Sequence, residues 1–140
     1  MRQLVPLFLL SVTIIGLISS IRSLFMAKFS KKQYISIENV VFLLLIYVTV
    51  LMGFGIIYVV LDLNSFPVLN QNGAAFTGGF SERLESSMYF SAITLLSVGY
   101  GDITPVGVGR WVAIVEALIG YTIPMAFVVK TVINIDRNES

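Results

Sequence analysis

Three long apolar runs divide the chain, and shorter polar intervals separate them. The runs cover residues 4–21, 40–61 and 111–129, and Glu116 is the one charged side chain inside them. A helix needs about 20 apolar residues to cross the hydrocarbon core of a bilayer, and each run is close to that length or above it. The pattern therefore predicts a helical membrane protein with three transmembrane helices.

The composition supports this class and excludes several others. Hydrophobic residues make up 56% of the chain and charged residues only 12%, and the mean hydropathy is +0.90. The net charge of +1 offers no general attraction to nucleic acid. The absence of His and Cys removes the commonest general base, thiolate metal ligands and disulfides. We expect no enzyme, no cofactor and no nucleic-acid partner.

The charges around the first run predict its orientation. One basic residue precedes the run and four follow it, namely Arg22, Lys28, Lys31 and Lys32. Basic residues near a span mark its cytoplasmic side, so the N-terminus is expected outside the cell. The alternative is a helix that lies along the inner membrane surface. A run that is apolar around most of its circumference favours spanning, and residues 1–32 are assigned as a membrane segment followed by a basic cytoplasmic loop.

The interval between the second and third runs contains two different parts. Residues 62–81 contain three Asn, three Gly and one Pro, and they are predicted to form an extracellular loop. Ser81 is a candidate N-cap for a short helix over residues 82–96, which is too short and too polar at its start to span. Such a half-helix is tolerated at membrane depth where protein buries it or water fills a cavity.

The sequence Ser97-Val98-Gly99-Tyr100-Gly101-Asp102 follows this short helix. Backbone carbonyls can replace the water around a cation if several in a row point to one axis. Alternation with residues at positive φ allows this, and Gly adopts positive φ without a Cβ penalty. The Val and Tyr side chains would then turn away from the axis into packing.

This string resembles the selectivity filter of potassium channels, whose Thr-Val-Gly-Tyr-Gly loops bind K⁺ through backbone carbonyls. The resemblance implies K⁺ sites at Ser97, Val98, Gly99 and Tyr100, with Gly101 completing the filter. It also implies a homotetramer in the plasma membrane, in contact with lipid, with K⁺ as permeant ion. The pore domain is assigned to residues 33–140, with an outer helix at about 40–61, a loop at 62–81, a pore helix at about 82–96, a filter at 97–102 and an inner helix at about 111–130.

The chain departs from the family pattern around the filter. In the family, the Asp that corresponds to Asp102 commonly forms a hydrogen bond with an aromatic residue of the pore helix and a carboxyl pair with a Glu of the same helix. Ile93 stands where that Glu would be expected, and Tyr89 is the candidate donor to Asp102. Ser97 and Leu96 stand where the family usually has Thr, so the innermost ion site is expected to differ while selectivity for K⁺ is kept.

Glu116 is a functional candidate because a carboxylate inside a span is costly. It either faces the pore and attracts cations, or lies behind the filter and accepts hydrogen bonds from Ser91, Thr94 or loop backbone. We favour the second arrangement, which makes Glu116 and Thr94 supports of the filter.

Gly120 and Pro124 weaken the same point of the last run. A helical N–H normally bonds the carbonyl four residues earlier, so Pro124 leaves the Gly120 carbonyl without its usual partner. Kinks concentrate at such sites. Inner helices of potassium channels often bend at a Gly in this region, and the pair is predicted to be a gating hinge rather than a passive kink. A hinge predicts a lower open probability for Gly120→Ala.

Other functions remain open at this point. A pore-loop subunit of a potassium transporter usually carries four degenerate copies in one chain, whereas this chain has one strong copy. A less selective cation channel often has an acidic residue at the position of Tyr100. A non-conducting scaffold would use the loop as a structural turn. No Arg-rich voltage-sensing helix is present, so membrane, ions or a separate regulatory subunit would control the gate.

Overall fold

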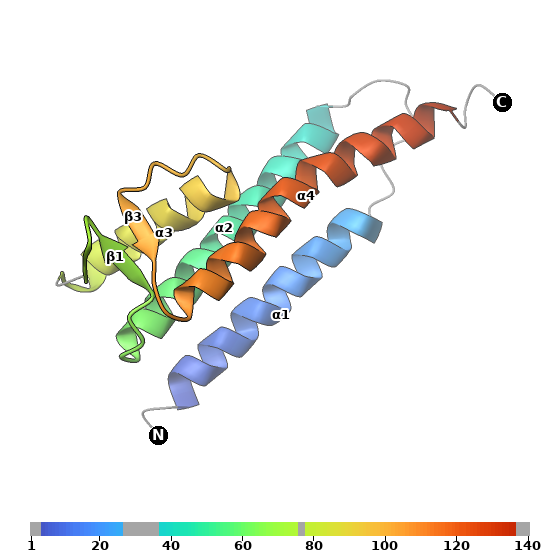
Figure 1. Cartoon of the computed structure of the whole chain (residues 1–140). Helices are drawn as coiled ribbons and strands as arrows, with labels where there is room; N and C mark the ends of the chain where they lie inside the picture. The colour runs from blue at the N-terminus through green and yellow to red at the C-terminus, as the bar shows by residue number, and fades with distance from the viewer. Residues whose placement is uncertain (1–3, 27–36, 76–77, 137–140) are drawn as a thin grey trace.

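The computed structural model describes residues 4–26, 37–75 and 78–136, and its elements are shown in Figure 1. In chain order these elements are α1 (Leu4–Met26), α2 (Ile37–Leu63), β1 (Leu69–Gln71), β2 (Ala74–Ala75), α3 (Phe80–Leu95), β3 (Ile103–Pro105) and α4 (Gly109–Asp136).

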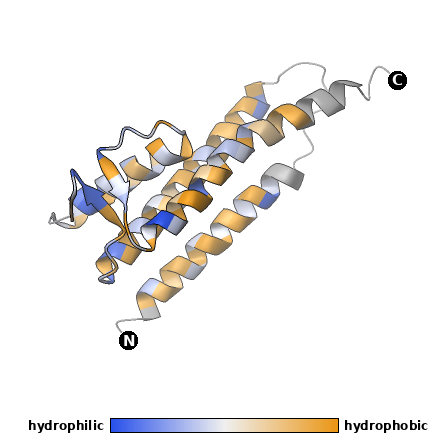
Figure 2. Ribbon diagram, viewed as in Figure 1, coloured by the Kyte–Doolittle hydropathy of each residue, from blue (hydrophilic) through white to orange (hydrophobic). Residues whose placement is uncertain are grey.

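The prediction of three transmembrane helices is confirmed. Helices α1, α2 and α4 are long and apolar enough to cross a membrane, over Val5–Ser23, Ile37–Leu63 and Gly109–Val129. They lie side by side, with the N-terminus at the end of the bundle that carries the sheet and the C-terminus at the other end (Figure 1). Their surfaces are mostly apolar, and polar residues gather around the sheet (Figure 2).

Each of these helices extends beyond its apolar run. The outer helix was predicted at about 40–61 and the inner helix at about 111–130, whereas α2 and α4 begin earlier and end later. Backbone hydrogen bonds continue a helix into the membrane–water interface, where polar side chains are tolerated. Hydropathy therefore locates the membrane-embedded part of a helix and not its ends.

Two glycines of α2 allow close packing on both sides of this helix. A Cβ on Gly53 would meet the Leu17 side chain of α1 at 2.7 Å, and a Cβ on Gly55 would overlap the Met88 side chain of α3. Small residues let membrane helices approach closely. Helix α2 is therefore the central helix of the chain, in contact with both α1 and the short helix α3.

The predicted loop over 62–81 contains a β-hairpin, so that prediction was wrong in part. Strand β1 pairs antiparallel with β2, and Gln71 lies opposite Ala74. The two residues between them, Asn72 and Gly73, have φ values of +52° and +82°. Positive φ at both central residues is typical of a type I′ turn, for which Asn-Gly is the preferred sequence.

Strand β1 also pairs antiparallel with β3, which gives the order β2-β1-β3. Asn70 lies opposite Thr104 and Gln71 opposite Ile103. Thr104 and Pro105, which follow the predicted filter, belong to β3. The sheet therefore joins the segment after the filter to the loop that follows α2.

Candidate functional site

The segment predicted to be the filter, residues 97–102 and called the filter segment below, has an alternating backbone. The φ values of Ser97, Gly99 and Gly101 are +57°, +58° and +82°, and the residues between them have no positive φ. Positive φ at the two glycines was expected. Positive φ at Ser97 was not expected, because a non-glycine residue seldom adopts it. Alternation over these positions turns successive carbonyls toward one side of the chain, which is the arrangement required for a row of carbonyl ligands.

The end of α3 explains the conformation of Ser97. The N–H of Ser97 donates to the Thr94 carbonyl at 3.0 Å, and the N–H of Val98 donates to the Ile93 carbonyl at 2.8 Å. With Leu96 as C-cap, these two bonds form a Schellman motif, in which the residue after the cap is left-handed. The motif that ends the helix thus sets the first positive φ of the filter. The Thr94 carbonyl takes part in this motif.

The side chains of the filter are exposed in the isolated chain. Val98 is 47% exposed and Tyr100 is 72% exposed. These side chains were expected to pack against neighbouring residues. The described residues of their own chain do not cover them. Trp111, at the start of α4, is likewise 73% exposed. Large apolar side chains left bare on one loop, as Val98 and Tyr100 are, are typical of an interaction surface.

The Asp102 end of the filter segment is attached to the sheet. The Asp102 carbonyl accepts a hydrogen bond from the N–H of Asn72 at 3.0 Å, and the Val68 carbonyl accepts one from Val106 at 2.8 Å. These bonds flank the pairing of β1 with β3. The chain that leaves the filter segment is therefore held by backbone bonds to the segment between α2 and α3.

Tyr89 and Asp102 meet beside the filter, as predicted. Burial, the hydrogen bond to Asp102 and the negative charge of that carboxylate together raise the pKa of Tyr89. The hydroxyl therefore stays protonated and acts as donor. Asp102 Oδ1 is buried and has no hydrogen-bond partner among the described residues.

Glu116 lies behind α3 and not on an open surface. Its side chain is 0% exposed. Glu116 Oε1 is hydrogen-bonded by the Ser91 hydroxyl, and Oε2 accepts from the Tyr58 hydroxyl at 2.8 Å. The Ser91 hydroxyl also lies 2.9 Å from the Leu51 carbonyl oxygen. The carboxyl group therefore joins α4 to both α2 and α3.

The expected bond from Ser91 to Glu116 is thus present, and the pore-facing arrangement of Glu116 does not match its full burial. Sequence reasoning missed Tyr58, although a tyrosine inside an apolar run is a signal that its hydroxyl has a polar partner. The Tyr58 ring also packs edge-on against Phe90 of α3, with centroids 5.2 Å apart.

Gly120 lies against the end of α3. A Cβ at this position would overlap the carbonyl group of Leu95, the last residue of α3. Helix α4 runs without interruption through Pro124. The Gly120 carbonyl that Pro124 leaves free accepts a hydrogen bond from the Tyr47 hydroxyl of α2 at 2.9 Å.

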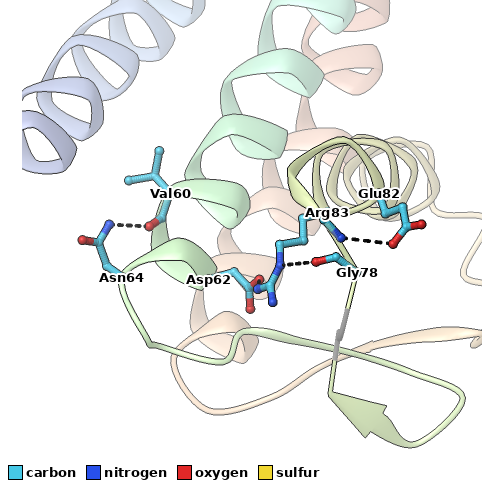
Figure 3. A network of polar contacts seen from close by, with 7 residues as sticks. Val60, Asp62, Asn64, Gly78, Glu82 and Arg83 are labelled. Atoms are coloured by element: carbon cyan, nitrogen blue, oxygen red, sulfur yellow. Dashed lines mark hydrogen bonds and ion pairs between the residues drawn. The ribbon is translucent and has the colours of Figure 1, made fainter.

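The start of α3 is fixed at the outer end of α2 by polar contacts that the sequence did not predict (Figure 3). Asp62 forms an ion pair with Arg83, whose Nε donates to the Gly78 carbonyl at 3.0 Å. Glu82 accepts a hydrogen bond from the N–H of Gly79 at 3.2 Å. The helix is capped by Gly79 and not by Ser81, because the chain turns into the helix two residues earlier than expected.

Comparison with known proteins gives one family and two relatives. Residues 46–137 match the sequence model of a family described as "Ion channel". The chain is 44% identical to Protein LctB of Geobacillus stearothermophilus over 121 residues, which cover 86% of this chain and 90% of that protein. It is 41% identical to Protein LctB of Bacillus caldotenax over 121 residues, which again cover 86% of this chain and 90% of that protein. No solved structure matches the chain significantly.

Proposed function

Because the chain belongs to the ion channel family, we propose that it forms a potassium-selective pore that conducts K⁺ passively across the plasma membrane. The observation that carries this proposal is the alternation of positive φ at Ser97, Gly99 and Gly101. In this proposal the carbonyls of residues 97–101 replace the hydration shell of K⁺.

The proposed pore consists of four identical chains. One loop cannot surround an ion, and a closed fourfold arrangement of residues 33–140 would place four filters around one axis. The exposed side chains of Val98, Tyr100 and Trp111 support this assembly. Neighbouring copies would cover these side chains and hold the diameter of the filter.

The supports of the filter act from two directions in this proposal. Tyr89 and Asp102 hold its outer end, together with the backbone bonds to the sheet. The Thr94 carbonyl holds its inner end through the Schellman motif. Glu116 anchors the pore helix α3 to α4 through Ser91. Gly120 and Pro124 form the hinge of the inner helix.

The experiment is flux through proteoliposomes that contain the purified protein and an imposed K⁺ gradient. We expect K⁺ flux that exceeds Na⁺ flux at equal gradients. Gly99→Ala should abolish selective flux, because a Cβ at φ +58° is strained by about 1–2 kcal/mol in each chain. Gly16→Ala is the matched control, since Gly16 lies within α1 and a Cβ there meets no atom within 4 Å. Equal Na⁺ and K⁺ flux through the wild-type protein would contradict the proposal.

A further inference from the structure

Pro124 creates a gap in the hydrogen bonding of α4. Proline has no N–H, so the carbonyl of Gly120 loses the bond that it would otherwise accept within the helix. Both residues lie in the part of α4 that is apolar enough to span a membrane. A carbonyl without a hydrogen-bond donor at that depth costs on the order of several kcal/mol. A replacement donor therefore stabilises the helix.

The replacement comes from another helix. The hydroxyl of Tyr47 donates to the Gly120 carbonyl oxygen at 2.9 Å, across the boundary between α2 and α4. The two helices run side by side (Figure 1). Tyr47 precedes Gly120 by 73 positions in the sequence, so this bond is purely tertiary.

The same point of α4 also contacts the helix that precedes the filter. Because a Cβ on Gly120 would overlap the Leu95 carbonyl group, α4 lies directly against the end of α3 there. Gly120 is therefore the place where α2, α3 and α4 meet. A change in the direction of α4 at Gly120 would move this junction and separate the carbonyl from the Tyr47 hydroxyl.

We propose that Tyr47 is a positioning residue of the gate, whose hydrogen bond to Gly120 holds α4 in the arrangement described above, and that this arrangement is the non-conducting one. This inference rests on the proposed channel function and on the hinge at Gly120. A change in the direction of α4 at Gly120 breaks the bond and exposes the carbonyl, so the bond favours the described arrangement of the helix.

The test is the open probability of Tyr47→Phe in single-channel recordings from planar bilayers. This variant keeps the ring and removes the hydroxyl. We expect the open-to-closed ratio to rise about two- to tenfold for each chain whose bond is lost, with an unchanged K⁺/Na⁺ permeability ratio. Thr49→Val is the matched control, because the Thr49 hydroxyl bonds the Leu45 carbonyl of its own helix at 2.8 Å. The control should gate as the wild type does.

A second variant separates this role from a general effect on folding. Pro124→Ala restores an N–H that can pair with the Gly120 carbonyl inside α4, so the Tyr47 hydroxyl becomes dispensable. The double variant should therefore gate like Pro124→Ala alone. If Tyr47→Phe alone fails to assemble, recovered assembly of the double variant supports the inference and continued failure overturns it.

Two further results would overturn the inference: wild-type gating in Tyr47→Phe, or an equally large effect of Tyr47→Phe in the Pro124→Ala background. Failure of the channel proposal is a separate result, because it would appear as absent or unselective K⁺ current in the wild-type protein.

Discussion

Replacing Tyr58 with phenylalanine would remove one of the two hydroxyl donors to the buried carboxyl group of Glu116. The Tyr58 hydroxyl lies 2.8 Å from Glu116 Oε2, and both side chains are 0% exposed. Phenylalanine keeps the ring and its edge-on contact with Phe90. The variant therefore isolates the loss of a single hydrogen bond between α2 and α4.

The expected cost follows from the burial of the acceptor. A buried acceptor left without its donor costs about 1–3 kcal/mol, and water cannot replace a hydroxyl that is fully enclosed. In the proposed tetramer the same loss occurs four times, so the total approaches about 4–12 kcal/mol if the four sites are independent. A decrease of this size is comparable to the whole stability of many proteins, which is about 5–15 kcal/mol.

The assay is thermal dissociation of the purified oligomer in detergent, followed by its conversion to monomers on a gel. Tyr58→Phe should dissociate at a clearly lower temperature than the wild type. Tyr121→Phe is the control, because the Tyr121 side chain is 64% exposed and should tolerate loss of its hydroxyl. An unchanged dissociation temperature for Tyr58→Phe would refute the view that Glu116 needs this donor.

Two further predictions concern the contacts that helix α3 makes with α4 and with Asp102. Gly120→Ala should destabilise the oligomer by about 1–3 kcal/mol per chain, measured by the same dissociation assay, because its Cβ overlaps the Leu95 carbonyl group. Unchanged stability would contradict that close contact, and the contact also means that Gly120→Ala does not isolate the hinge. Tyr89 has a raised pKa through burial and through Asp102, so its stabilising contribution is complete below about pH 10 and is lost as pH rises through the folded-state pKa. Tyr89→Phe should therefore lose less oligomer stability above pH 10 than the wild type does. The same alkaline loss in both proteins would contradict this prediction.

The sequence was sufficient for the elements that local chemistry determines. Continuous apolar runs located the three long helices, and the glycines at 99 and 101 predicted positive φ at both positions. The cost of a charge inside a span directed attention to Glu116, and Ser91 was among the three partners considered. Each of these predictions depends on residues close together in the chain or on a strong penalty for a buried charge.

Contacts between distant segments were harder to predict. The pairing of β1 with β3 joins segments more than 30 positions apart, and strands of two or three residues carry no useful periodicity. The hairpin itself had a local signal, Asn72-Gly73, which was overlooked within a polar interval. The bonds of Tyr47 and Tyr58 to α4 depend on how the helices pack, and the left-handed Ser97 depends on the motif that ends α3.

The central claim is that backbone carbonyls of residues 97–101 from four chains select K⁺. The most direct measurement is the reversal potential of single channels in a planar bilayer with K⁺ on one side and Na⁺ on the other. The account predicts a potential far from zero, with the sign that K⁺ permeation requires. A reversal potential near zero would show equal permeability to the two ions and would contradict the account.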